Sequence, residues 1–164
     1  MADVTYRDIR ETDFDNLHRL CSEWEVVRQL GSWPWPPDPA FTLSRCVPFK
    51  GNGFVWAICS DDQLIGTVGV TDGTLGYMLS PDYAGRGLMT AAVERALDAG
   101  FKTFDLIKAC TWFDNPASAR VLTKHGFERF GTCVDPSPAR GEDVETHSYE
   151  LTRDRWQTLR SQAQ

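Results

Sequence analysis

The chain has 164 residues, of which 41% are hydrophobic and 24% charged, and its formal net charge is −6. Since domains usually hold about 100 to 200 residues, this length and composition predict one globular domain over residues 1–164, and the acidic balance argues against a nucleic-acid-binding surface. No apolar run approaches the roughly 18 residues of a membrane span, and the acidic N-terminus lacks the features of a secretory signal, so we expect a cytoplasmic protein.

The N-terminal third predicts a strand, a helix and an irregular cap. Residues 4–10, "VTYRDIR", alternate in polarity as a strand does. A helix is expected to begin at Asp13 as N-cap and to continue to Cys21, with an apolar face at spacings of three and four. The following "LGSWPWPPDPAF" is too rich in proline for a regular element. We expect it to form an ordered cap anchored by Trp33 and Trp35.

The middle of the chain predicts three antiparallel strands. The apolar runs "FVWAICS", "LIGTVGVT" and "LGYMLS" follow one another with short polar breaks between them. The breaks hold Asp61-Asp62 and Asp72-Gly73, which are residues typical of tight hairpin turns. The third strand leads into the glycine-containing segment "SPDYAGRGLMTAAV", and a helix is expected from there to a stop at Gly100.

The C-terminal part predicts a strand, a helix and a closing hairpin. "DLIKACTW" is the strand, and "NPASARVLTKHGF" is the helix, with Asn115 as N-cap, Pro116 at the first helical position and Gly126 at the exit. "GFERFGTCV" and "VETHSYEL" then pair around the loop "DPSPARGED". The order of elements therefore predicts an α/β (α+β) fold with a mixed sheet.

The cysteines and histidines do not indicate a metal site or a disulfide framework. The five cysteines are widely spaced and form no CxxC pair, and the three histidines are equally scattered. Most cysteines have apolar neighbours, which predicts small buried side chains in a reducing compartment.

The turn Gly85-Arg86-Gly87 between a strand and a helix predicts an anion held against the backbone. An NTPase phosphate loop is excluded, because no GxxxxGK is present. A dinucleotide fingerprint fits poorly, since Thr90 stands where it needs a third small residue and Asp105 begins the next strand instead of ending it. The pyrophosphate of coenzyme A is the third alternative, held by unpaired N–H groups at the start of the helix. A plain turn that needs positive φ is the simpler alternative.

The context of this turn resembles one family. "LGYMLSPDYAGRGLMTAAV" resembles the acetyl-CoA-binding segment of the GNAT N-acetyltransferase superfamily, and "NPASARVLTKHGF" resembles a second signature of its RimJ/RimL-like branch, whose members acetylate ribosomal-protein N-termini. "WPWPP" and "SYELTRDRW" also fit this branch, so the resemblance covers nearly the whole chain. It implies a GNAT fold with a mostly antiparallel sheet of about seven strands flanked by helices.

Three positions depart from the family pattern. Asp82 replaces a frequent Gln or Arg before the first glycine, and Ala91 replaces a Glu that is common in the branch. Leu122 stands where many members have a tyrosine that acts as general acid. The first two changes leave cofactor binding by the backbone intact, whereas the third requires another proton donor.

The resemblance implies that acetyl-CoA is the co-substrate and that the fourth and fifth strands part to admit its pantetheine arm. A main-chain N–H, assigned to Leu79, would polarise the thioester carbonyl. Ser118 is assigned as the acid that protonates the leaving thiolate. The alternative is a purely structural role, since serine is also favoured in the first turn of a helix. The residues expected to bind the cofactor are Met78, Leu79, Ser80, Gly85, Arg86, Gly87, Leu88, Met89, Thr90, Asn115 and Ser118.

Other roles stay open at this stage. Arg86, Arg120 and Lys124 are alternatives for contacts with the cofactor phosphates. The general base is not identified; it acts through water or is one of four acidic candidates. These candidates are Glu25, Asp135, Glu142 and Asp143.

The acceptor is expected to be a primary amine bound near Trp33, Trp35 and Tyr77. A protein N-terminal α-amine is the first expectation, and an amino acid, a polyamine or an antibiotic is the alternative within the same chemistry. A non-catalytic acyl-CoA-binding module and a nucleotide-binding protein are the contrasting classes. We expect a monomer or a homodimer that binds no nucleic acid, membrane or metal.

Overall fold

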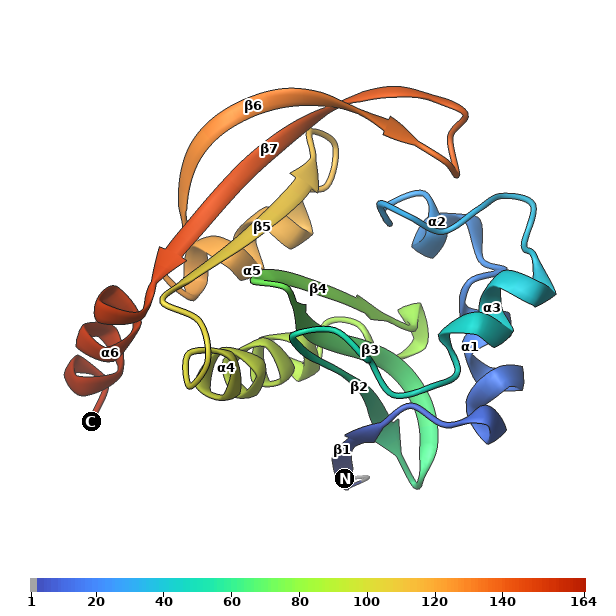
Figure 1. Ribbon diagram of the computed structural model, residues 1–164, viewed down its shortest axis with the longest axis horizontal. Helices are drawn as coiled ribbons and strands as arrows, with labels where there is room; N and C mark the ends of the chain where they lie inside the picture. The colour runs from blue at the N-terminus through green and yellow to red at the C-terminus, as the bar shows by residue number, and fades with distance from the viewer. Residues whose placement is uncertain (1–2) are drawn as a thin grey trace.

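A computed structural model of the chain describes residues 3–164 (Figure 1). All its strands form one seven-stranded sheet in the order β1-β2-β3-β4-β5-β7-β6. Neighbouring strands are antiparallel except β4 and β5, which are parallel. The predicted mostly antiparallel sheet of seven strands is therefore confirmed.

The elements follow the expected order, with three additional α-helices and two 3-10 helices. The strands are β1 (Val4–Asp8), β2 (Gly53–Ser60), β3 (Gln63–Thr71), β4 (Thr74–Leu79), β5 (Leu106–Trp112), β6 (Glu128–Ser137) and β7 (Glu142–Thr152). The α-helices are α1 (Phe14–Leu20), α2 (Trp24–Val27), α3 (Pro39–Arg45), α4 (Leu88–Gly100), α5 (Pro116–Lys124) and α6 (Arg153–Gln162). The 3-10 helices are η1 (Glu11–Asp13) and η2 (Pro81–Tyr83). Between residues 3 and 164, none of the helices has the length and apolarity needed to cross a bilayer.

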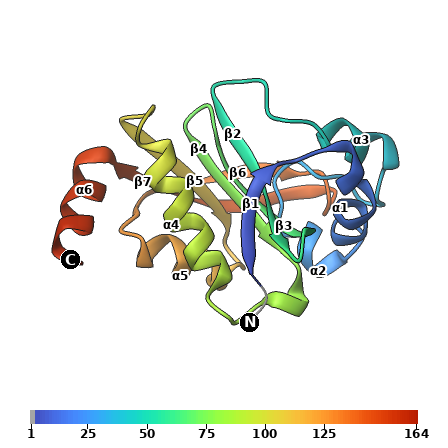
Figure 2. The same cartoon turned by 90° about the horizontal axis from the view of Figure 1, so that it is seen from below.

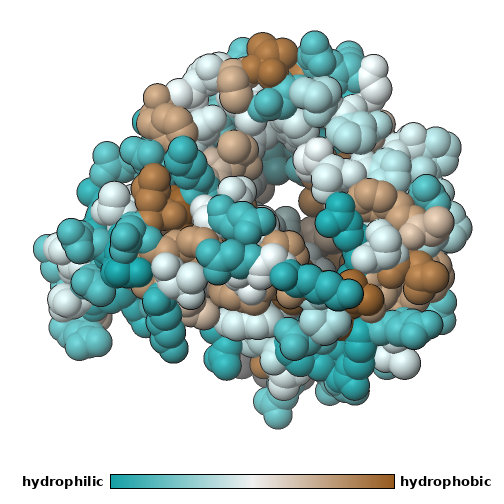
Figure 3. Space-filling view, in the orientation of Figure 1, coloured by the Kyte–Doolittle hydropathy of each residue, from teal (hydrophilic) through white to brown (hydrophobic). Residues whose placement is uncertain are grey.

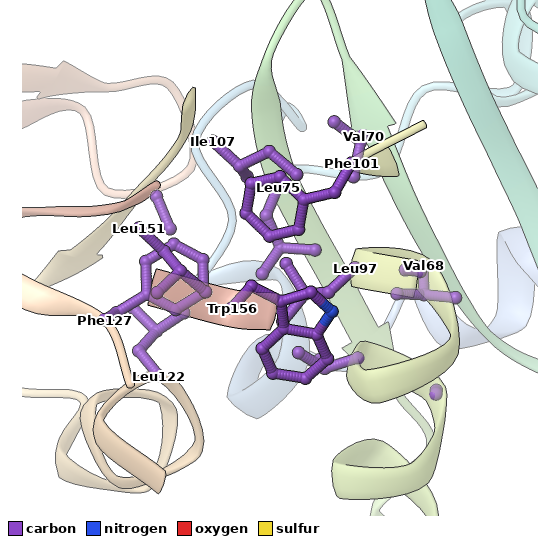
Figure 4. Close-up of a cluster of buried hydrophobic side chains, with 14 of the residues drawn as sticks. Val68, Val70, Leu75, Leu97, Phe101, Ile107, Leu122, Phe127, Leu151 and Trp156 are labelled. Carbon is purple, nitrogen blue, oxygen red and sulfur yellow. The ribbon is translucent and has the colours of Figure 1, made fainter. Parts of the chain in front are cut away.

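The helices form two groups on either side of the sheet (Figures 1 and 2). One cluster of buried side chains joins α4, α5 and α6 to the sheet, through residues such as Val68, Leu97, Leu122 and Trp156 (Figure 4). A second cluster joins α1 and the cap to the opposite face, through Leu17 and others. Alternation of side chains along β3 and β4 explains how both faces are covered.

Both predicted hairpin turns are present. Asp61 and Asp62 have φ of 50° and 61°, and Asp72 and Gly73 have φ of 50° and 86°. Such positive φ values at both central positions match the right-handed twist of the strands. The register of β2, β3 and β4 is thereby set within the chain segment that leads to the glycine turn.

Several expectations at element ends need correction. α3 begins at Pro39, since proline suits the first turn of a helix and the Asp38 carboxylate accepts the Ala40 N–H at 2.9 Å. The proline-rich segment therefore ends in a helix, although it was expected to be irregular throughout. The short α2 and the C-terminal α6 were not predicted.

The final hairpin is also longer than predicted. β6 extends to Ser137 and β7 begins at Glu142, so most of the expected loop "DPSPARGED" is paired strand. Side-chain periodicity did not reveal this, because most side chains of β6 are exposed and its sequence therefore lacks an alternating pattern.

Two residues occupy their expected positions for different reasons. Gly100 does end α4, but its φ is not positive; a Cβ there would lie 3.0 Å from Ile107 Cδ1, so close packing requires the glycine. Asp13 precedes α1, but its carboxylate accepts hydrogen bonds from Arg7 and from the Arg10 N–H instead of capping the helix.

The cysteines divide into two groups. Cys21, Cys46 and Cys59 are buried as expected, and burial raises the pKa of Cys21 to about 12. Cys110 and Cys133 are exposed, which corrects the expectation of burial for these two. Cys110 lies on β5, where alternation turns every second side chain away from the core, and Cys133 lies on β6, most of whose side chains are exposed.

Candidate active site

The sheet opens between β4 and β5. Their pairing is limited to Thr74 and Lys108, after which the two strands diverge. Figure 3 shows an opening in the surface in this part of the molecule, between β4 and the hairpin of β6 and β7. A cavity of about 800 Å³ occupies the split and is lined by both strands, the glycine turn and the start of α5. This cavity is called the cleft below.

Backbone geometry directs two N–H groups of β4, those of Tyr77 and Leu79, toward the cleft. The Ser80 N–H donates to the Ile65 carbonyl of β3 at 2.8 Å. Since N–H groups alternate in direction along a strand, the N–H of Met78 also faces β3, and those of Tyr77 and Leu79 face the opposite side, toward β5. Leu79 therefore presents an N–H toward the cleft as expected, whereas the N–H of Ser80 is already used.

The glycine turn leads into the cleft with open backbone. Gly85 and Gly87 both have φ of 75°, and a Cβ added to either would meet no atom within 4 Å. Both glycines therefore have the positive φ that a plain turn requires, and free space lies beside them. Gly87 is the N-cap of α4, and because it has no side chain, no capping side chain occupies the N–H groups of the first turn.

The first turn of α4 forms an anion-binding end. The first intrahelical bond runs from the Ala91 N–H to the Gly87 carbonyl, which leaves the N–H groups of Leu88, Met89 and Thr90 without helical partners. All three residues line the cleft, and no acidic residue lies in this turn. Donor groups and the helix dipole together favour a phosphate here.

α5 contributes polar groups on the other side of the cleft. The Asn115 side chain accepts the Ser118 N–H at 3.2 Å, which confirms its predicted role as N-cap. The Ser118 Oγ lies 2.7 Å from the Tyr77 hydroxyl, and that hydroxyl also lies 3.2 Å from the Ser118 carbonyl oxygen. Burial raises the pKa of Tyr77 to about 12, against the opposing effect of the Ser118 hydrogen bond. Tyr77 thus stays protonated at neutral pH.

His125 joins the two helices that flank the cleft. Its ring nitrogens lie 2.7 Å from the Val121 carbonyl oxygen and 3.0 Å from the Thr90 carbonyl oxygen. The buried ring therefore connects the end of α5 to the first turn of α4. This contact holds the turn that carries the free N–H groups at a fixed distance from Ser118.

A second cavity of about 450 Å³ lies on the side of the sheet covered by α1 and α3. It shares the segments 30–32 and 76–78 with the cleft, so the two spaces meet beside Gly76. A Cβ on Gly76 would meet no atom within 4 Å, and the same holds for Gly31. We call this second space the acceptor cavity.

Most of the predicted site residues lie at these two spaces. The cleft is lined by Tyr77, Met78, Leu79, Gly85, Gly87, Leu88, Met89, Thr90, Asn115 and Ser118. Trp33 lines the acceptor cavity. Ser80 and Arg86 line neither space, and the Arg86 guanidinium donates to the Asp82 carbonyl at 2.9 Å. Trp35 also lines neither and packs its ring against Trp24.

The candidate bases are dispersed. Glu25 lines the cleft, and Asp135 lines a smaller hollow beside it. Glu142 and Asp143 begin β7 and line neither the cleft nor the acceptor cavity. The acceptor cavity itself is lined by no carboxylate.

A cluster missed by the sequence analysis closes one end of the site. Asp114 accepts hydrogen bonds from Arg140 at 2.8 and 2.9 Å and from Arg28 at 3.0 Å, and Arg140 also donates to the Arg28 carbonyl. The Arg140 hydrogen bond, and then the charges of both arginines, lower the pKa of Asp114 despite partial burial. The cluster joins the cap, the start of α5 and the last hairpin. No local motif identifies it, because its members are 26 to 112 residues apart.

The acetyltransferase (GNAT) domain model matches residues 3–128 of the chain. The chain belongs to the GNAT acetyltransferase family. It is an N-acetyltransferase, and acetyl-CoA is its co-substrate. The expected family and activity are thus confirmed.

Relatives of similar length support the assignment to the GNAT family. The uncharacterized N-acetyltransferase p20 of Bacillus licheniformis is 26% identical over 163 residues, covering 88% of this chain and 92% of the relative. The uncharacterized N-acetyltransferase YoaA of Bacillus subtilis is 28% identical over 164 residues, covering 91% and 93%.

Solved structures share the GNAT fold. Spermidine N-acetyltransferase from Vibrio cholerae, in complex with coenzyme A and spermine, is 16% identical with a TM-score of 0.75, covering 94% of this chain and 98% of that chain. RimL, a ribosomal L7/L12 alpha-N-protein acetyltransferase in complex with coenzyme A, is 17% identical with a TM-score of 0.75, covering 93% and 95%. At these identities the two structures show that the fold is shared.

Proposed function

We propose that this GNAT enzyme transfers the acetyl group of acetyl-CoA to a primary amine at the junction of the cleft and the acceptor cavity. The observation that carries the proposal is the meeting of the two spaces at Gly76, between the Leu79 N–H on one side and Trp33 on the other. A thioester in the cleft and an amine in the acceptor cavity meet there without crossing the sheet.

The residues of the cleft fit coenzyme A part by part. The N–H groups of Leu88, Met89 and Thr90 hold its pyrophosphate, and the diverging strands leave room for its pantetheine arm. Open space around Gly85 and Gly87 lets the phosphates approach the backbone closely. Arg120 and Lys124 lie on α5 and do not line the cleft, so no contact with the phosphates is proposed for them.

In the proposed reaction the amine nitrogen attacks the thioester carbonyl carbon, and the carbon–sulfur bond breaks. The Leu79 N–H stabilises the negative charge that develops on the carbonyl oxygen. Ser118 donates its hydroxyl proton to the leaving sulfur and regains a proton from water. The Tyr77 hydroxyl lies 2.7 Å from the Ser118 Oγ, and in this mechanism it donates a hydrogen bond to that oxygen. The proton lost by the amine passes to water, since the acceptor cavity is lined by no carboxylate.

Two kinds of primary amine are consistent with this proposal. A protein N-terminal α-amine is favoured by the RimJ/RimL-like features of the sequence. A small-molecule amine is favoured by the acceptor cavity, whose volume of about 450 Å³ lies in the range of small-molecule pockets.

The proposal is tested by following thiol release from acetyl-CoA with purified protein and a panel of amines. The panel holds peptides with different N-termini, amino acids, polyamines and aminoglycosides. Acetylated product from at least one amine, together with stoichiometric free coenzyme A, is the expected result. Tight coenzyme A binding without turnover of any acceptor would instead favour the non-catalytic acyl-CoA-binding module.

A further inference from the structure

The charges of the acceptor cavity have one sign. Arg45 and Lys50 are its only lining residues with a full charge at neutral pH, and no Asp or Glu lines it. The chain as a whole has 23 acidic and 17 basic residues. A cavity whose charged lining residues are all cationic therefore differs from the acidic composition of the chain. The cavity therefore selects by charge as well as by size.

Neither cation is neutralised by the rest of the chain. Among residues 3–164, no carboxylate forms an ion pair with Arg45 or Lys50. Arg45 ends α3, and its guanidinium lies 4.7 Å from the centre of the Phe41 ring, which fixes the side chain without satisfying its charge. Both groups are thus available to an anionic ligand.

The remaining walls are mainly apolar. They include Leu17, Trp33, Val47, Phe49 and Val55. The uncharged polar exceptions include Ser32, Ser44, Thr67 and Thr71. A polyamine would place its several ammonium groups beside Arg45 and Lys50 with no carboxylate to balance them, which is unfavourable. An amine with an apolar body and one carboxylate matches both the walls and the charges.

The positive charges also favour the reactive form of the amine. An ammonium group beside like charges loses its proton more readily than in water, because the charged form is disfavoured. The absence of carboxylates from the acceptor cavity thus assists deprotonation of the amine, a step for which the cavity provides no protein base.

We propose that the acceptor of this enzyme is a small amine that bears a carboxylate, such as an apolar amino acid, and that Arg45 and Lys50 determine this specificity. The inference rests on the proposed acetyl transfer and narrows its acceptor class. The carboxylate pairs with the two cations, and the amine reaches the thioester beside Gly76.

The test compares acceptors that differ in one group. Acetylation rates are measured in parallel for leucine, leucinamide, isoamylamine and spermidine. A leucyl-aspartyl peptide amide is also tested, because its carboxylate belongs to a peptide side chain. We expect kcat/KM for leucine to exceed that for leucinamide and isoamylamine by at least about tenfold, the effect of one charge-assisted contact. Equal rates for leucine and leucinamide, or a preference for spermidine, would overturn the inference. A preference for the peptide over leucine would assign the anion to a peptide and also overturn it.

Variants connect the preference to the two side chains. Arg45→Met and Lys50→Met are expected to lower kcat/KM for leucine about tenfold through KM and to leave leucinamide within about twofold. Lys50→Glu is expected to shift the preference toward spermidine. Lys102→Met, on a residue that lines neither space, is the matched control. Equal losses for leucine and leucinamide would contradict a charge-specific role.

The outcomes separate the two levels of the proposal. If amines are acetylated without any preference for a carboxylate, the acceptor class is wrong and acetyl transfer stands. If acetyl-CoA binds and no amine of either panel is acetylated, the proposed function itself fails and the acceptor class fails with it.

Discussion

The Tyr77 hydroxyl on β4 and the Ser118 Oγ at the start of α5 lie 2.7 Å apart across the cleft. This contact joins β4 to α5 beside the split in which β4 and β5 diverge beyond Thr74 and Lys108. Leu122, which stands where many family members have a tyrosine acid, is buried in the core and does not line the cleft. In the proposed mechanism, Ser118 of α5, in contact with Tyr77 of β4, replaces this acid.

Replacing Ser118 tests the proposed acid. We expect Ser118→Ala to lower kcat about 100-fold, since general acid catalysis contributes roughly 10²-fold or more, and to leave the dissociation constant of coenzyme A within about threefold. Single-turnover kinetics with acetyl-CoA measures the first quantity and calorimetry the second. Thr123→Ala on the exposed side of α5 is the matched control. An unchanged kcat in Ser118→Ala would remove Ser118 from the mechanism.

Replacing Tyr77, the partner of Ser118, tests its raised pKa through the free energy of unfolding at alkaline pH. The folded state raises the pKa of Tyr77 from 10.0 to about 12, so the unfolded chain loses this proton first as pH rises. The contribution of the group is complete below pH 10 and is lost between pH 10 and about 12, by about 2 to 3 kcal/mol. Tyr77→Phe should reduce this alkaline decline of the free energy of unfolding, as measured by urea denaturation. An identical decline in both proteins would contradict the assignment.

Glycine substitutions distinguish the requirement for a positive φ from the requirement for open space beside the backbone. Gly87→Ala places a side chain at φ of 75° and should destabilise the protein by about 1 to 2 kcal/mol, while weakening coenzyme A binding at the start of α4. Gly131→Ala is the control, because Gly131 has open space and no positive φ. Thermal denaturation and calorimetry with coenzyme A measure the two effects. Normal affinity in Gly87→Ala would contradict close approach of the phosphates.

Gly76→Val tests the passage between the two spaces. A side chain at Gly76 has room in the fold and projects into the junction, so we expect little change in thermal stability or in coenzyme A affinity. The kcat/KM for the amine should fall at least about 100-fold, since displacement of the reacting groups by 1 Å can already cost that factor. Acetyl transfer at the normal rate would show that the amine arrives by another path.

The cluster around Asp114 predicts a measurable effect on stability. Arg140→Met removes two charge-assisted hydrogen bonds to Asp114, and those to the Arg28 carbonyl and the Gln29 side chain, and should cost about 2 kcal/mol or more. Arg160→Met, at an exposed pair with Glu94, should cost less than about 1 kcal/mol. Because the pKa of Asp114 is lowered in the fold, its contribution is present above the ordinary pKa of the carboxyl and is lost as pH falls through the lowered value. Urea denaturation at pH 7 and pH 3 should show a smaller difference between wild type and Arg140→Met at pH 3.

The sequence predicted those parts of the fold and site that depend on short segments. Gly85, Gly87 and Asn115 carry their roles in the backbone geometry of a few residues, so local chemistry identified them. Arg45 and Lys50 could not be assigned in this way, because they reach the acceptor cavity only after α3 packs beside β3. Arg140 and Asp114 meet across 26 residues through the curvature of the last hairpin, and exposed strands such as β6 have no clear periodicity. Long-range packing thus accounts for what the sequence did not predict.

A crystal structure with coenzyme A tests the central claim most directly. The account predicts a pyrophosphate within hydrogen-bond distance of the Leu88, Met89 and Thr90 N–H groups, a pantetheine arm between β4 and β5, and a thiol beside Ser118 that faces the acceptor cavity at Gly76. Coenzyme A bound elsewhere, or a thiol directed away from both Ser118 and Gly76, would contradict it.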